Sequence, residues 1–264
     1  MKQQKGFFSP YTMNFTALKA AKFLFSITLI LLIAHCISFF LFFTLPVQHI
    51  TLLLTKLFDV GRDYNVPTLF SSFLLLMASI LLFYIYRQKK AGSGKKADYR
   101  WLVLSIIFFY LSIDEYARIH EELMETVHSR LHIKLTGYLF VPWVIPYALF
   151  TLIVFIYFFR FVLNLPKKTS NLIFIAGFIY VAGALGFEML EAHELEINGR
   201  NVLVHLQETI EETMEMCGVI IFIYSLLDYV APQSIKIKIV HTEDNNQGNE
   251  YTQKDPDRAN VSSL

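Results

Sequence analysis

Long runs of apolar residues without a charged side chain dominate this sequence. Phe23 to Phe43 holds no ionisable group except His35 and the thiol of Cys36, and the runs Val66 to Tyr86 and Leu139 to Phe159 carry no charge. A helix of about 20 apolar residues crosses a hydrocarbon core of about 30 Å. Each run is long enough, so the sequence predicts an all-α, polytopic membrane helix bundle.

We expect six transmembrane helices and a short interfacial helix between the first two. The run from Phe23 exceeds the 7 to 15 residues, roughly, of a signal-peptide core, so we interpret it as a retained first span. The expected spans are 22–45, 67–87, 101–121, 139–160, 171–192 and 208–230. Residues 1–21 then form an N-terminal segment, 22–231 the bundle and 232–264 a polar tail whose composition is typical of disorder. The leucine-rich stretch between Pro46 and Pro67 is the expected interfacial helix.

The basic residues predict the orientation of these spans. Most of the 23 Lys and Arg fall before span 1, between spans 2 and 3, between spans 4 and 5, and after span 6. Cytoplasmic loops carry the excess of Lys and Arg. Both termini are therefore expected in the cytoplasm, which requires an even number of spans.

Charge and cysteine content exclude several other functions. The net charge is +1, so no basic field favours nucleic acid. The two cysteines, Cys36 and Cys217, are far apart in apolar runs and predict no disulfide framework. The lipid bilayer is the one partner that the composition predicts.

Acidic residues gather at the outer ends of spans 3, 5 and 6. One stretch ends span 3 and follows it, and the other joins spans 5 and 6. The acidic residues of these stretches are Asp114, Glu115, Glu121, Glu122, Glu125, Glu188, Glu191, Glu194, Glu196, Glu208, Glu211, Glu212 and Glu215. At about 1.5 Å rise per residue, Asp114, Glu188, Glu212 and Glu215 lie roughly 20 to 25 Å from the cytoplasmic ends of their spans, and His35 about 20 Å. The outer half of the membrane should thus contain one layer of carboxylates and histidines.

Placing such a layer of charged groups inside the membrane costs free energy, which another interaction must offset. A charge at mid-membrane costs about 2.5 to 3.5 kcal/mol on insertion scales. Protonation, pairing with Arg118 as counter-charge, a bound cation or a water-filled cavity would each reduce this cost. Arg118 can pair with Asp114 or Glu121, which share its helix face.

The first interpretation is a divalent metal site, open to the extracytoplasmic side, in a metal-dependent membrane enzyme. Carboxylates and imidazoles on facing helices bind iron, zinc or manganese. The candidate ligands are Asp114, Glu115, His120, Glu188, Glu191, His193, Glu208, Glu212 and Glu215, with His35 as a further candidate.

Three alternatives stay open. Intramembrane acids also mark proton- or cation-coupled transporters. The pair Glu211 and Glu212, followed by Thr213, is also typical of glutamate-dependent intramembrane hydrolases, although the Arg expected a few residues later is absent. A structural polar network without a bound ion would lock the helices together.

Several short motifs resemble a group of bacterial multipass membrane proteins. They are Asn65-Val66-Pro67-Thr68 with Ser71-Ser72, Leu111-Ser112-Ile113-Asp114-Glu115 with His120-Glu121, Trp143-Val144-Ile145-Pro146, and Glu211-Glu212 with Glu215-Met216 and Gly218. The resemblance implies a location in the bacterial plasma (inner) membrane. It implies no reaction.

Overall fold

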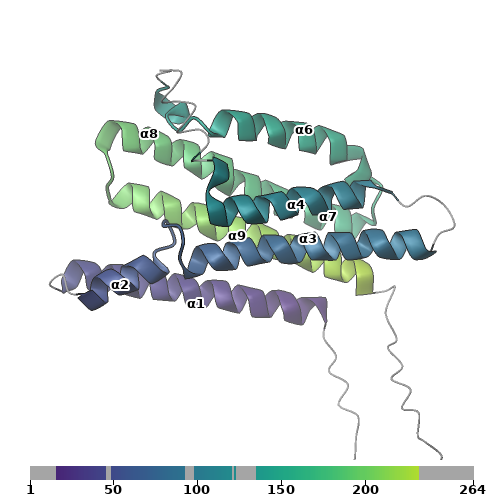
Figure 1. Ribbon diagram of the computed structural model, residues 1–264, viewed down its shortest axis with the longest axis horizontal. Helices are drawn as coiled ribbons and strands as arrows, with labels where there is room; N and C mark the ends of the chain where they lie inside the picture. Colours follow the sequence, from purple (N-terminus) through teal and green to yellow (C-terminus); the bar gives the residue numbers. More distant parts are fainter. Residues whose placement is uncertain (1–15, 46–48, 93–97, 121, 123–134, 232–264) are drawn as a thin grey trace, which may run out of the picture. The chain divides into compact units, whose positions relative to one another are not determined.

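Every element in the part of the chain that the structure describes is a helix. A computed structural model of the protein describes residues 16–45, 49–92, 98–120, 122 and 135–231. The elements are α1 (Ala17–Thr44), α2 (His49–Phe58), α3 (Val66–Gly92), α4 (Arg100–Ala117), the 3₁₀ turn η1 (Gly137–Leu139), α6 (Val144–Leu163), α7 (Lys167–Val181), the π-helix η2 (Ala182–Phe187), α8 (Glu188–Asn198) and α9 (Val202–Val230) (Figure 1). The predicted all-α class is confirmed. Glu121, Glu125 and the predicted tail lie outside the described residues.

Five helical stretches among the described residues have the length and apolar composition of membrane spans. They are Ala17–Phe42, Val66–Ala91, Val144–Leu163, Lys167–Asn198 and Val202–Val230. Large apolar side chains also face outward: Phe40 is 67% exposed and Phe178 is 75% exposed. Soluble monomers rarely expose large apolar patches, whereas a bilayer covers them. These features indicate a multipass membrane protein.

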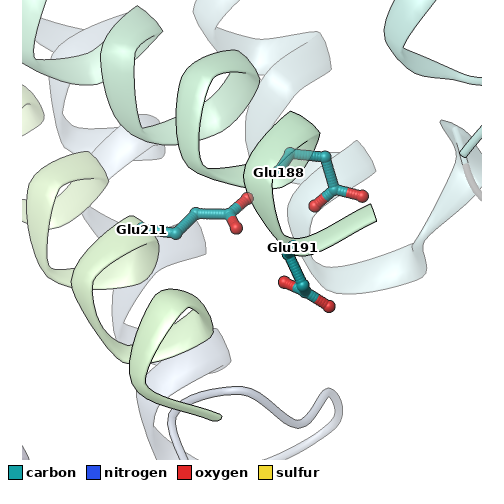
Figure 2. Close-up of side chains that lie close together, drawn as sticks. All are labelled: Glu188, Glu191 and Glu211. Carbon is teal, nitrogen blue, oxygen red and sulfur yellow. The ribbon is translucent and has the colours of Figure 1, made fainter. Parts of the chain in front are cut away.

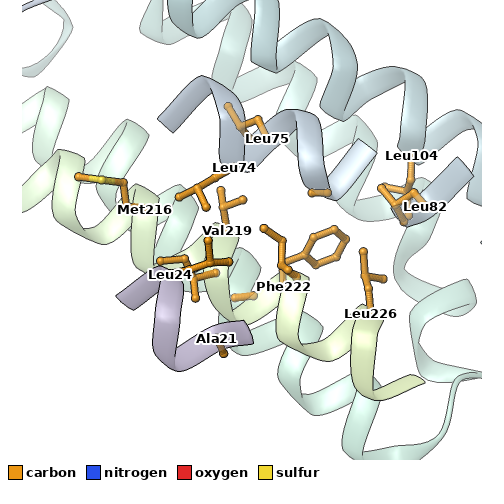
Figure 3. Close-up of a cluster of buried hydrophobic side chains, with 14 of the residues drawn as sticks. Ala21, Leu24, Leu74, Leu75, Leu82, Leu104, Met216, Val219, Phe222 and Leu226 are labelled. Carbon is orange, nitrogen blue, oxygen red and sulfur yellow. The ribbon is translucent and has the colours of Figure 1, made fainter. Parts of the chain in front are cut away.

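The apolar core surrounds α9, which packs against α1, α3 and α7. Figure 3 shows Met216, Val219, Phe222 and Leu226 of α9 among leucines of α1, α3 and α4. Phe108 of α4 stacks on Phe222, with ring centroids 4.7 Å apart and planes at 4°. This core fills the half of the bundle that the sequence places toward the cytoplasm.

Two pairs of serines hold α4 against α3. Ser79 Oγ donates to the Ser105 carbonyl over 2.8 Å, and Ser105 Oγ returns a bond to the Ser79 carbonyl over 2.9 Å. Ser72 and Ser112 repeat this exchange at 2.7 and 2.8 Å. Serine hydroxyls commonly join helices inside membranes in this way. The bonds fix the rotation of α4, so another of its faces turns toward α6 and α7.

Glycines let α9 approach α7 and η2 closely. A Cβ atom on Gly218 would lie 2.9 Å from the Ala176 carbonyl oxygen, and a Cβ on Gly183 would lie 2.9 Å from the Glu211 carbonyl oxygen. Small residues at helix interfaces allow such close packing in membranes. The contact at Gly183 sets Glu211 beside the chain that leads to Glu188.

Some helix ends differ from the prediction. The span expected over 101–121 ends as α4 at Ala117, because Arg118 adopts a left-handed conformation with φ of 52° and its N–H bonds the Asp114 carbonyl. The span expected from 139 begins at Val144, after the 3₁₀ turn. The predicted link 193–207 is mostly helical and turns at Gly199, whose φ is 66°.

Candidate functional site

A cavity of about 600 Å³ opens between α4, α6, α7, η2, α8 and α9. Its polar end gathers acidic side chains from four parts of the chain: the α2–α3 loop, α4, α8 and α9. These acids are Asp63, Asp114, Glu115, Glu188, Glu191, Glu208, Glu211, Glu212 and Glu215, and Arg118, His120 and Arg200 lie among them. The helices thus bring together the carboxylates that the sequence placed in one layer.

Three glutamates form the tightest cluster in this cavity. Figure 2 shows Glu211 of α9 pointing toward α8, which carries Glu188 and Glu191, and one carboxylate oxygen of each lies within 4.8 Å of the others. Two oxygens that bind one cation from opposite sides, each at about 2.4 Å, are about 4.8 Å apart. The cluster therefore has the dimensions and the donor atoms of a site for a hard divalent cation.

The π-helix η2 sets the register of this cluster. Because η2 ends at Phe187, Glu188 is the first residue of α8. A π-turn rotates the following residues relative to a regular α-helix and is frequent at functional sites. Glu188 and Glu191, three residues apart, share the helix face that meets Glu211.

Asp114 forms a hydrogen-bonded wall on the α4 side of the cavity. Its Oδ1 accepts from the His120 backbone N–H over 2.9 Å. Its Oδ2 lies 2.9 Å from His120 Nδ1 and accepts from the Tyr147 hydroxyl over 2.8 Å. Trp143 packs its ring against His120 at 4.5 Å between centroids. The Asp114 carboxylate is thus hydrogen-bonded to other protein groups. These bonds orient His120 and link α4 to α6.

Arginines lie where the cavity meets the α2–α3 loop. Arg118 Nε is 3.0 Å from Asp63 Oδ2, so Arg118 pairs with an acid of the α2–α3 loop. Of the two acids predicted from its helix face, Glu121 lies outside the described residues. Arg200 pairs with Glu208, whose other oxygen is 2.9 Å from His205 Nδ1. A second cavity of about 430 Å³ adjoins this region and is lined by Gly61, Arg62, Asp63, Tyr64, Arg118 and Arg200. The acidic cavity thus has a basic rim.

His193 and His35 occupy other places. His193 is not one of the described residues that line the cavity. Its ring instead stacks on Tyr138, with 4.5 Å between the ring centroids. His35 is buried in α1, where Nδ1 accepts the Val60 N–H over 3.1 Å and Nε2 lies 3.1 Å from Thr209 Oγ1. His35 thereby joins α1, the α2–α3 loop and α9, which is the role of a hydrogen-bonded core histidine.

Replacing His35 with Ala should reduce stability without changing the metal content. The change leaves the buried Val60 N–H without its acceptor, which costs about 1 to 3 kcal/mol. Thermal unfolding in detergent would show the loss, and elemental analysis of the same preparation would show the metal. A large loss of metal from a variant that remains folded would contradict this structural role.

The comparisons with known proteins identify a family but no reaction. Residues 24–230 match the family described as domain of unknown function, DUF8692. The chain belongs to this family. The match covers the helices and the cavity. No curated protein and no solved structure matches the chain.

Most of the acidic residues that line the cavity were predicted from the sequence as ligands, but Glu211 and Asp63 were not. Glu211 entered only the hydrolase interpretation, although it is three residues from Glu208 and four from Glu215, a spacing that gives one helix face. Both of those neighbours are buried with it. Asp63 and Arg200 lie in loops, where helix periodicity gives no signal, and tertiary packing alone brings them to the cavity.

Proposed function

We propose that this protein is a multipass protein of the bacterial plasma membrane that holds a divalent metal ion in its acidic cavity and uses it in catalysis. The observation that carries the proposal is the cluster of Glu188, Glu191 and Glu211, whose oxygens lie within 4.8 Å of one another. Three carboxylates so close repel one another unless a cation or protons reduce their charge. A divalent ion supplies that charge and uses all three as ligands.

The donor set favours manganese or iron among the three metals predicted from the sequence. Carboxylate oxygens suit hard cations, whereas zinc sites in proteins more often use sulfur and nitrogen ligands. His120 lines the same cavity from the α4 side and is held by Asp114. A divalent ion in an accessible cavity can polarise a phosphoryl or carbonyl oxygen of a substrate.

The apolar core favours a site that is closed at its inner end, rather than a transport route through the bundle. Below the acids, the cavity is lined by Leu104, Ile107 and Phe108, and Phe108 stacks on Phe222 in the centre of the bundle. A proton or cation route needs polar groups or water along its whole length. The described inner halves of α4 and α9 instead pack apolar side chains there.

Elemental analysis of detergent-purified protein, prepared without chelator, tests the metal proposal. We expect stoichiometric manganese or iron, removed by chelator and restored by reloading. Absence of metal before and after reloading would overturn the proposal and leave a polar network of protonated or paired acids. Zinc at full occupancy would overturn the assignment of the metal but not the site.

We further propose that α4 is a sixth crossing and that both termini are cytoplasmic. The helix α4 has 18 residues, carries Arg100, Asp114 and Glu115, and packs along α3. Burial of Asp114 inside the bundle keeps its charge away from lipid. The excess of Lys and Arg lies on the proposed cytoplasmic side.

Labelling of single cysteines with an impermeant maleimide tests this orientation. In a background without Cys36 and Cys217, we expect Ile197→Cys to react in intact cells because it is 62% exposed at the proposed outer end of α8. Ser93→Cys, in the α3–α4 connection, should react only after the cells are permeabilised. The reverse pattern would contradict the orientation, and equal labelling of both would contradict an odd number of crossings between them.

A further inference from the structure

The cavity has an apolar limb that the acidic cluster does not use. Much of its wall is apolar, although Thr151 and Tyr180 also line it. The apolar lining residues include Leu104, Phe108 and Leu111 of α4, Phe150 and Val154 of α6, and Val181 of α7. The distance along α4 from Leu104 to Leu111 is about 10 Å. The limb therefore runs along the helices, in the direction of lipid chains.

The middle of α6 stands away from its neighbours and forms one side of this limb. The buried residues of α6 are Val144 at its start and Phe158, Phe161 and Val162 at its end. Between them, Tyr147, Phe150, Thr151 and Val154 line the cavity at helical spacing. The two ends of α6 are thus packed into the protein, while its middle leaves space that protein side chains do not fill.

We propose that one acyl chain of a membrane phospholipid occupies this limb, with the lipid phosphate at the acidic end of the cavity beside the metal ion. The proposal rests on the proposed function, because it assigns the substrate class of the same site. A volume of about 600 Å³ lies within the range of roughly 300 to 1,000 Å³ typical of ligand sites. An apolar limb under a polar end matches the two parts of a lipid.

Charge determines which lipid group fits the polar end. A phosphate alone among so many carboxylates would be repelled. A divalent ion on Glu188, Glu191 and Glu211 offsets two of their three negative charges, and Arg118 and Arg200 line the same end of the cavity. Arginine and divalent metal ions are the usual partners of phosphate in proteins. Binding of the phospholipid should therefore depend on the metal.

The chain offers a matched pair of glycines to test the limb. A Cβ at Gly177 would meet nothing within 4 Å, and this residue lines the cavity. A Cβ at Gly186 would also meet nothing within 4 Å, but Gly186 lies on the same continuous helix outside the lining. Gly177→Leu should extend a side chain into the limb, starting from a Cβ with open space around it, and Gly186→Leu is the control for the same change of residue. Val154→Trp fills the limb from the α6 side.

Native mass spectrometry of the detergent-purified, metal-loaded protein tests the proposal with lysophosphatidylglycerol, which carries one acyl chain. We expect saturable binding of one lipid to the wild type and to Gly186→Leu, and affinity weaker by about tenfold or more in Gly177→Leu and Val154→Trp. Glycerol phosphate, which has the phosphate but no chain, should bind much more weakly. Chelation should release the lysolipid from the wild type.

The outcomes separate this inference from the metal proposal, because metal content is measured in every sample. Equal lipid binding in the wild type and in both limb-filling variants, with metal retained, would overturn the lipid assignment alone. Binding of glycerol phosphate as tightly as the lysolipid would also overturn it, since a soluble phosphate compound would then be the ligand. Absence of metal from all samples would overturn the proposed function, and saturable lipid binding lost in Gly177→Leu would still support the limb as a chain site.

Discussion

Replacing Glu211 with glutamine should remove most of the metal from the purified protein. Glutamine keeps the size of the side chain and one oxygen, but it removes the negative charge that faces Glu188 and Glu191. Loss of a group that only orients a ligand weakens metal binding by about 10- to 100-fold, so loss of a direct ligand should weaken it at least as much. Elemental analysis after dialysis against trace metal would show the change.

Glu194→Gln is the matched control for that experiment. Glu194 lies on α8 with Glu188 and Glu191, but its carboxylate accepts from Asn198 and Asn201 over 2.8 and 2.7 Å rather than lining the cavity. The control should keep its metal. Equal metal in the Glu211 and Glu194 variants would place the ion elsewhere, and equal loss in both would point to a general effect on α8.

The second large effect is expected at Gly218, where alanine should destabilise the bundle. Its Cβ would lie 2.9 Å from the Ala176 carbonyl oxygen and 2.9 Å from the Tyr180 backbone nitrogen. Because these are backbone atoms, α7 and α9 must separate. Overpacking costs about 1 to 3 kcal/mol, partly offset by the higher helix propensity of alanine, which is worth about 1 kcal/mol. A fall in Tm of about 2 to 8 °C would follow.

Gly177→Ala should have the opposite sign. Its Cβ meets nothing within 4 Å, so only the gain in helix propensity remains. Thermal unfolding of both variants in one detergent compares the two glycines directly. If Gly218→Ala is as stable as Gly177→Ala, the close approach of α7 to α9 in the structure is wrong.

The layer of acids was predictable because it depends only on helix rise and on continuous spans. Counting residues from the ends predicted to be cytoplasmic placed Asp114, Glu188, Glu212 and Glu215 at similar depths, and all four line one cavity. The apolar runs likewise predicted the long helices α1, α3, α6 and α9, with ends that differ from the structure by about six residues at most. The depth of a residue along a helix changes little when the predicted ends of the helix are slightly wrong.

Which acids lie next to one another was less predictable, because this depends on how each helix is rotated about its axis and on the course of the loops. Glu188, Glu191 and Glu194 share one stripe of α8, yet only the first two line the cavity, and Glu194 is hydrogen-bonded to Asn198 and Asn201 instead. The pair of Arg118 with Asp63 joins the residue just after α4 to another loop. No periodicity in the sequence marks such contacts.

Because of the π-helix, the geometry of the acidic cluster depends on the number of residues that precede Glu188 as well as on their identity. Each residue of an α-helix turns the chain by about 100°, since 3.6 residues complete a turn. Inserting one residue within Ala182–Phe187 would rotate Glu188 and Glu191 about 100° away from Glu211, although every carboxylate is still present. Deleting one residue would instead let the wide turn return to α geometry with the phase of α8 kept. Within this stretch, an insertion therefore threatens the site more than a conservative change of side chain does.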